Sequence, residues 1–185
     1  MSKPKTFQHP ICLYFHTHWD REWYEPFVSY QHKLLRTVDG VLSLLEQNQL
    51  PCFTLDGQTA LLEDYLSFRP ESEARIATLV NNQRLSVGPW FVMPDEFLVS
   101  GESLIRNLQR GIAESKLLGQ KTFTGYLPDT FGHSGDIPMI LRGSGIHSAV
   151  IWRGVNPKES LFLWQSPNGQ TVNTLHLTEG YFNNI

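Results

Sequence analysis

The chain alternates short apolar runs with longer segments in which apolar side chains recur every three or four positions. Runs with the length and composition of buried strands occupy 11–15, 52–55, 84–87, 121–124 and 147–152. Helical spacing predicts helices over 33–50, 58–68, 71–82, 101–118 and 136–144, with a loop over 24–32 that contains Pro26. Strand followed by helix, repeated in this way, predicts an α/β fold with a parallel sheet.

The pattern changes after Gly154. Two apolar runs, 161–164 and 171–176, flank the turn sequence Asn168-Gly169 and are predicted to pair as a β-hairpin. The chain has 185 residues, 41% of them hydrophobic, which is enough for one core and favours a single domain.

Charge and composition exclude several classes of protein. The net charge is −3 and no basic run is present, so we expect no nucleic-acid partner. No stretch reaches 18 apolar residues and no apolar segment follows the basic N-terminus, so we expect neither a membrane span nor a signal peptide. Cys12 and Cys52 fall in predicted strands, and two buried thiols fit a reducing cytoplasm.

The first candidate site is the stretch His16-Thr-His-Trp-Asp-Arg-Glu-Trp23, which follows the first predicted strand. Ligands in parallel α/β folds bind beyond the carboxyl ends of the strands. His16, His18 and Asp20 occupy alternate positions, so an extended backbone would point all three to one side. Imidazole and carboxylate together suit zinc better than calcium or magnesium. The plain alternative is a strand end with one hydrogen-bonded histidine and surface charges.

A second candidate stretch, 125–138, places Asp129 in a segment rich in proline and glycine. Alone it has ordinary turn chemistry. Together with the first stretch, however, the sequence closely resembles the catalytic domain of glycoside hydrolase family 38, the zinc-dependent α-mannosidases, and most of all its bacterial branch. The resemblance also covers 55–66, 87–90 and 94–102, so it extends along nearly the whole chain.

The resemblance implies a parallel (β/α) barrel-like catalytic domain, of which residues 1–185 would be an incomplete N-terminal portion. It implies a retaining α-mannosidase with one zinc ion, held here by His18, Asp20 and Asp129. Asp129 would also be the nucleophile that forms a covalent glycosyl-enzyme intermediate. Substrates would be α-mannosides, either mannosylated small molecules or oligosaccharides.

Other roles are carried over by the same resemblance. Arg153 would orient the nucleophile, Trp23 would stack on the sugar, and Phe131 would line the pocket. His16 and His133 would support the metal site from behind. The plain alternatives are a core tryptophan and a surface arginine. Three further acids follow predicted strands and would either contact substrate or cap helices and turns: Asp56, Asp95 and Glu96.

The family's fourth zinc ligand, a histidine, and its acid/base carboxylate are expected beyond residue 185. We therefore expect this piece alone to bind metal weakly and to turn over poorly. We also expect it to expose apolar barrel surface that favours self-association into a homo-oligomer. Two other classes remain open. One is a non-catalytic subunit that binds metal or sugar, and the other is a metal-dependent carbohydrate deacetylase that uses zinc-activated water.

Overall fold

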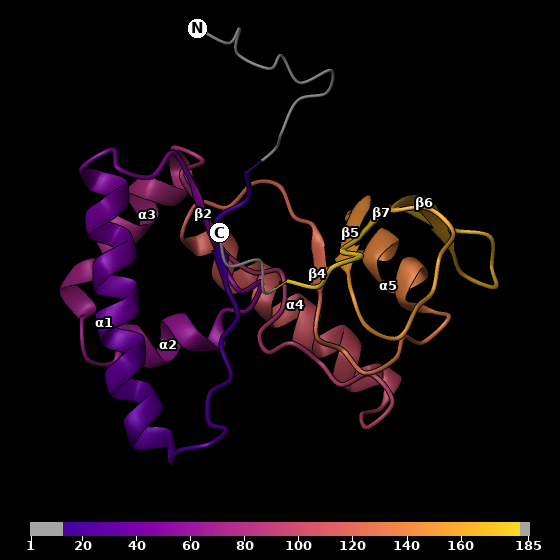
Figure 1. Ribbon diagram of the computed structural model, residues 1–185, viewed down its shortest axis with the longest axis horizontal. Coiled ribbons are helices and arrows are strands. Elements are labelled where there is room, and N and C mark those ends of the chain that lie inside the picture. Colours follow the sequence, from indigo (N-terminus) through magenta and orange to yellow (C-terminus); the bar gives the residue numbers. More distant parts are fainter. Residues whose placement is uncertain (1–12, 182–185) are drawn as a thin grey trace, which may run out of the picture.

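The structure, a computed structural model, describes residues 13–181 and contains two small sheets with helices packed against them (Figure 1). The first sheet is parallel, in the order β1 (His16–Thr17), β2 (Phe53–Leu55) and β3 (Leu85–Ser86). The second has the order β4 (Gly125–Leu127), β5 (Ser148–Ile151), β7 (Thr171–His176) and β6 (Leu161–Gln165). Only β6 is antiparallel to its neighbour. The predicted α/β class with parallel strands is confirmed, in the form of a partial barrel.

The helices divide between the two sheets (Figure 1). The first core is formed by α1 (Phe27–Glu46), α2 (Ala60–Leu66) and α3 (Glu73–Asn81) with β2 and β3, and a 3-10 turn (Pro70–Ser72) precedes α3. The second core is formed by α4 (Gly101–Leu117) and α5 (Ile137–Gly143) with β4, β5 and β7. Because each helix presents apolar side chains to its sheet, both cores are formed by buried apolar residues, and the strand ends remain available for a site.

Helix α1 is displaced from its predicted range. It begins at Phe27, six residues before the predicted start at Lys33, because Pro26 forms the N-cap instead of marking a loop. Proline is compatible with the start of a helix, where backbone N–H groups have no intrahelical partner. The helix ends at Glu46, and Asn48 follows with a left-handed φ of 56°. Asparagine tolerates that conformation, which explains why the helix stops before Leu50.

The fourth strand was predicted over 121–124, and this was wrong. The strand is Gly125–Leu127, whose three residues are all buried. Of the four preceding residues, Lys121, Thr122 and Thr124 are polar and exposed, and Phe123 is half-buried against the second core. A Cβ on Gly125 would lie 2.6 Å from a methyl of Leu141 on α5, so glycine here permits close packing of the helix on the strand.

The hairpin prediction is confirmed, with Asn168-Gly169 in the turn and Gly169 at a φ of 85°. The prediction that Cys52 is buried was wrong, because the residue lies just before β2 and is an exposed free thiol. Cys12 lies outside the described residues, as does the start of the first predicted strand. The cytoplasmic location remains a prediction.

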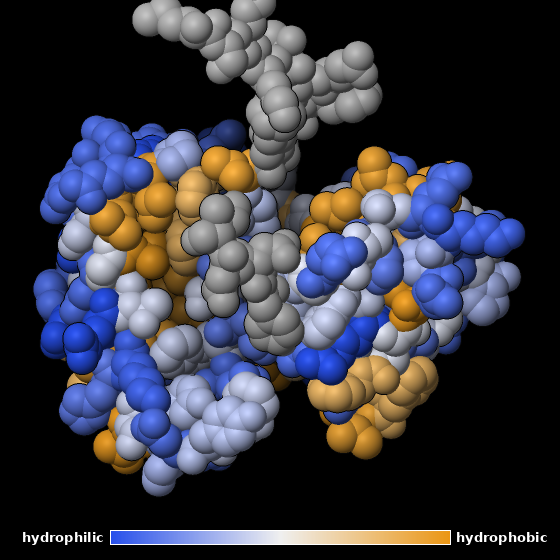
Figure 2. All heavy atoms as spheres, viewed as in Figure 1, coloured by the Kyte–Doolittle hydropathy of each residue, from blue (hydrophilic) through white to orange (hydrophobic). Residues whose placement is uncertain are grey.

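Apolar side chains are also exposed at the surface. In the loop between β3 and α4, Phe97, Leu98 and Val99 are 68%, 80% and 43% exposed. Figure 2 shows an orange patch at the lower right, where Figure 1 places this loop. Leu161 and Leu163 on β6 are similarly exposed, at 69% and 66%. Within residues 13–181, no helix has the length and hydropathy needed to cross a membrane.

Candidate metal and catalytic site

The ends of β1 and β4 bring together the three residues expected to bind zinc. His18 Nε2 lies 3.6 Å from an Asp20 carboxylate oxygen and 3.4 Å from an Asp129 carboxylate oxygen. The three ligand atoms lie within 4.8 Å of one another. Around a tetrahedral zinc with bonds of 2.0–2.1 Å, neighbouring ligand atoms are about 3.3 Å apart. The cluster therefore has dimensions suited to one zinc ion.

The imidazole of His18 is oriented for this purpose. Nδ1 lies 3.1 Å from Asp56 Oδ1, and since a carboxylate only accepts, Nδ1 carries the hydrogen. Nε2 then faces the two other carboxylates, is buried, and has no hydrogen-bond partner among the described residues. A buried polar atom without a partner is costly, and a metal ion would satisfy it. The residues present therefore fit zinc, with a histidine fixed by a carboxylate on its far nitrogen.

Asp56 is the residue that fixes His18, and its side chain is fully buried. Its Oδ2 accepts hydrogen bonds from the Trp19 backbone N–H at 2.7 Å and from Gln58 Nε2 at 2.5 Å. Burial raises the pKa of Asp56, although these donors and His18 act in the opposite direction. The residue follows β2 as His18 follows β1, so its strand-end position was a usable signal. Sequence reasoning nevertheless considered only substrate contact or capping for it, and the structure places it behind His18.

Three carboxylates control the charge of His18. Burial alone lowers the pKa of the imidazole, but the hydrogen bond to Asp56 and the charges of Asp56, Asp20 and Asp129 outweigh burial. The net result is a pKa above the ordinary value of 6.5. A site that attracts a proton so strongly also attracts a metal cation, because both are favoured by the same negative charges.

Asp129 is paired with Arg153, which lies just after β5. Arg153 Nε donates to Asp129 Oδ1, and the Arg153 backbone N–H donates to the Pro128 carbonyl at 3.3 Å. Its guanidinium lies 4.6 Å from the ring centroid of Phe131 and 4.4 Å from that of Trp152. The pairing expected from the sequence is therefore present, and aromatic rings restrict the arginine on two sides.

Tyr181 is a site residue that sequence reasoning missed. Its ring lies 4.8 Å from the His18 ring and 5.1 Å from that of Trp152. Burial raises the pKa of its hydroxyl, and the charge of Asp129 and a hydrogen bond to it raise it further. Tyr181 comes five residues after the end of β7. The strand-end rule that selected His18 and Asp129 could have found it as well.

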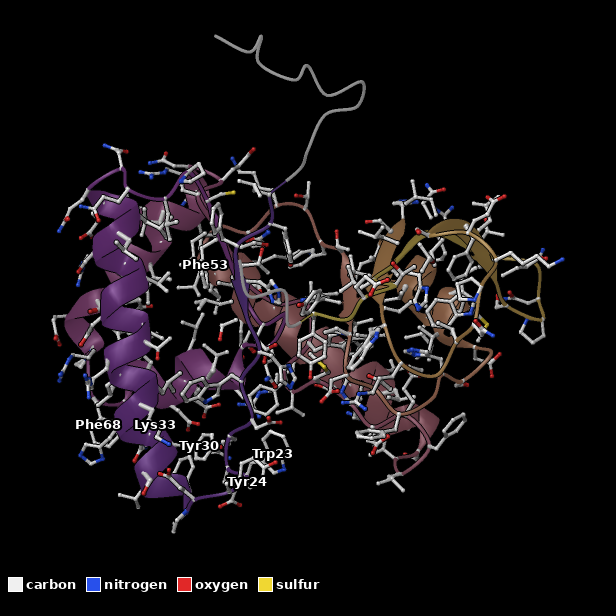
Figure 3. All side chains as sticks on the ribbon, in the orientation of Figure 1. Trp23, Tyr24, Tyr30, Lys33, Phe53 and Phe68 are labelled. Atoms are coloured by element: carbon white, nitrogen blue, oxygen red, sulfur yellow. The ribbon has the colours of Figure 1, made fainter. Side chains whose placement is uncertain are left out.

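The two expected substrate aromatics are both exposed, so neither is a core residue. Trp23 is 66% exposed and stacks on Tyr24, with ring centroids 4.2 Å apart and planes at 26°. Figure 3 shows the pair side by side near the start of α1. Phe131 is 69% exposed and lies under Arg153, next to Asp129.

The two histidines expected to support the metal site, His16 and His133, contact other residues than the three clustered side chains. His16 Nδ1 is 3.2 Å from the Tyr126 hydroxyl, and its ring stacks on Tyr14 at 5.1 Å. His16 is not part of the cluster of His18, Asp20 and Asp129, and β1 ends at Thr17, so the strand alternation does not extend to His18 and Asp20. His133 is buried between Glu96 and the backbone carbonyl of Arg153.

The chain is similar in sequence to known glycosyl hydrolases. The sequence pattern of the glycosyl hydrolases family 38 N-terminal domain matches residues 8–184. A protein of Halalkalibacterium halodurans named as a candidate mannosylglycerate hydrolase is 40% identical over 184 residues, which cover 91% of this chain and 20% of the relative. The α-mannosidase 2C1 of Mus musculus is 32% identical, over 89% of this chain and 16% of its own length. The chain thus spans about a fifth or less of these relatives.

Solved structures agree with the sequence comparisons. The crystal structure of an α-mannosidase from Enterococcus faecalis superposes with a TM-score of 0.88 at 36% identity, covering 92% of this chain and 20% of that one. A 4-α-glucanotransferase from Thermococcus litoralis superposes with a TM-score of 0.68 at 14% identity, which shows a shared fold alone. With its N-terminal-domain pattern matched from residue 8 to residue 184, this chain belongs to glycosyl hydrolase family 38.

Proposed function

We propose that the chain carries the metal-binding and nucleophilic half of a retaining α-mannosidase site. The observation that supports this most is the convergence of His18, Asp20 and Asp129, with the His18 Nε2 atom buried and unpartnered between the two carboxylates. Asp129 differs from Asp20 in being paired with Arg153. One carboxylate is thus suited to metal binding alone and the other to both metal binding and chemistry.

Zinc is the metal that this donor set favours, because one imidazole nitrogen and two carboxylate oxygens match its usual ligands. His18, Asp20 and Asp129 would hold it. When bound, zinc would act as a Lewis acid toward the sugar hydroxyls and help to hold the ring in a strained conformation. The described residues supply three ligands, and the family resemblance implies a histidine as the fourth.

The proposed reaction uses Asp129 as the nucleophile. One of its carboxylate oxygens forms a bond to the anomeric carbon while the bond from that carbon to the leaving oxygen breaks, and a separate acid protonates the leaving oxygen. Water then cleaves the resulting glycosyl ester, so that the anomeric configuration is retained. Arg153 holds the carboxylate in one orientation through its Nε–H, and the Tyr181 hydroxyl is hydrogen-bonded to the same carboxylate.

The substrate we propose is an α-mannoside, since relatives bear the names α-mannosidase and mannosylglycerate hydrolase. Trp23 provides an exposed aromatic face to stack on the apolar side of a sugar, while Tyr24 covers its other face. Phe131 would border the same sugar next to Asp129. A zinc-water mechanism, as in carbohydrate deacetylases, is disfavoured because the relatives bear glycosidase names.

The test is zinc-dependent hydrolysis of an aryl α-mannoside by the purified 185-residue chain. We expect slow product release, which an aryl leaving group permits without a protonating acid; it should stop on chelation, return with zinc, and be absent in Asp129→Asn. Asp39→Asn, which removes a carboxylate bonded to Tyr65 in the first core, serves as the matched control. Equal hydrolysis by wild type and Asp129→Asn would contradict the proposal, as would activity unaffected by chelation.

A further inference from the structure

Two buried ionisable side chains near Asp129 have no part in the proposed reaction. Glu96 lies in the loop between β3 and α4, and His133 lies in the loop between β4 and α5. Their side chains are 0% and 3% exposed. Charges are costly to bury unless they are paired and fully hydrogen-bonded, so the arrangement of this pair is restricted.

The pair is fully hydrogen-bonded. His133 Nδ1 lies 2.8 Å from Glu96 Oε1, and the Ser134 backbone N–H donates to Glu96 Oε2 at 2.6 Å. His133 Nε2 lies 3.1 Å from the Arg153 carbonyl oxygen, and because a carbonyl only accepts, Nε2 carries a hydrogen. The edge-on contact with Trp164, at 5.1 Å between centroids, fixes the plane of the ring. One imidazole thus connects the loops that follow β3, β4 and β5.

These three loops are also in close backbone contact. A Cβ on Gly154 would lie 2.6 Å from the Gly132 Cα, and a Cβ on Gly132 would lie 2.4 Å from the Phe97 ring. The Thr130 hydroxyl donates to the Pro94 carbonyl at 3.2 Å. Because the loops touch directly, a shift in one of them displaces the others.

We propose that Glu96 and His133 act as a positioning pair that holds Arg153 against Asp129. His133 anchors the carbonyl of Arg153, Glu96 anchors His133, and the Arg153 side chain reaches Asp129 from that fixed backbone. The catalytic consequence rests on the proposed function, in which Asp129 is the nucleophile. The structural link from Glu96 to Asp129 does not depend on it.

The link can be measured by nitrogen-15 NMR of the Arg153 Nε–H group in the 185-residue chain. Glu96→Gln should leave its resonance and exchange protection unchanged, because a glutamine amide can donate to neutral His133 and accept from Ser134. The double variant Glu96→Gln/His133→Phe keeps the ring volume and leaves no buried charge, but it removes the donor to Arg153. In this double variant we expect the Arg153 Nε–H to exchange faster with solvent, and its chemical shift to move toward that of a free arginine.

Glu114→Gln is the matched control, since Glu114 is bonded to Thr59 and Arg110 rather than to His133 or Arg153, and its substitution should leave Arg153 unaffected. An unchanged Arg153 Nε–H resonance in the double variant would overturn the proposal. Wild-type chain gives a second measurement that needs no variant to fold. The His133 Nε2–H should exchange slowly with solvent, and a fast-exchanging Nε2–H would equally overturn the proposal.

Activity provides a readout that general destabilisation would not reproduce. In the double variant we expect kcat to fall about 10- to 100-fold, with KM changed less than about threefold, because misplacing a reacting group by on the order of 1 Å costs about that much. Glu96→Gln should retain kcat. If wild type shows no hydrolysis, the proposed function fails while the NMR result still decides whether the pair positions Arg153.

Discussion

Replacing Asp56 by asparagine should change which nitrogen of His18 carries the hydrogen. Asp56 Oδ2 accepts from two N–H donors, those of Trp19 and Gln58, while Oδ1 accepts from His18 Nδ1. An asparagine has one oxygen for these two positions. Placing it toward Trp19 and Gln58 satisfies two donors, so the amide NH₂ must face His18 Nδ1. Nδ1 then becomes an acceptor, and the hydrogen moves to Nε2, where it blocks metal binding.

The expected magnitude follows from this conflict. Loss of a carboxylate behind a ligating histidine typically weakens metal binding about 10- to 100-fold, or about 1.4 to 2.7 kcal/mol. Because Asp56 is fully buried, water cannot take over the hydrogen bond that its carboxylate accepts from His18, so we expect the upper part of that range. In the opposite amide orientation the NH₂ group would face the N–H donors of Trp19 and Gln58. Leaving these two buried donors without an acceptor costs at least as much free energy.

The assay is zinc titration of the metal-free chain against a chromophoric chelator, with nitrogen-15 NMR to identify the His18 tautomer. Asp39→Asn is the control, because it makes the same substitution at an aspartate bonded to Tyr65, away from the site. Wild-type affinity in Asp56→Asn, with the hydrogen still on Nδ1, would refute the reasoning.

Three further predictions concern pH, metal and packing. Zinc affinity should rise with pH up to the raised pKa of His18 and then level off, because the proton on Nε2 competes with zinc below that pKa. A zinc affinity that stays constant in titrations from pH 5.5 to 8 would contradict this. Zinc at about 100 times its Kd should stabilise the fold by about 2.7 kcal/mol in thermal unfolding, and a shift of Tm that persists in His18→Ala would place the metal elsewhere. Gly111→Ala should destabilise α4 by about 1–3 kcal/mol despite the better helix propensity of alanine, since its Cβ would lie 2.1 Å from the Trp90 backbone. Gly40→Ala in α1, where a Cβ meets nothing within 4 Å, should instead stabilise by up to about 1 kcal/mol, and denaturant unfolding that ranks the two variants the other way would refute the packing argument.

The sequence allowed the helices to be predicted better than the strands. Apolar spacing located α2, α3, α4 and α5 to within a few residues, because each of these helices buries a single stripe. The strands are only two to six residues long, so composition gives little signal. Strand β4 was predicted at 121–124, a few residues too early, whereas it begins at Gly125, whose lack of a side chain admits Leu141.

The candidate site was partly predictable for a physical reason. His18 and Asp129 are far apart in sequence and follow strands of the two different sheets, but the carboxyl ends of parallel strands gather at one end of a barrel, even a partial one. The roles of Asp56 and Glu96 depend on which side chain lies beside them after folding. Spacing alone could not reveal that Asp56 faces His18 or that Glu96 faces His133.

The central claim is that Asp129 attacks the anomeric carbon, and covalent trapping tests it most directly. A fluorinated α-mannosyl fluoride is suitable, because fluoride leaves without needing a proton and the fluorine on the ring slows hydrolysis of the ester. Mass spectrometry of the zinc-loaded chain should show one added glycosyl group, located on Asp129 after proteolysis. An adduct on another residue, with Asp129 unmodified, would contradict the account.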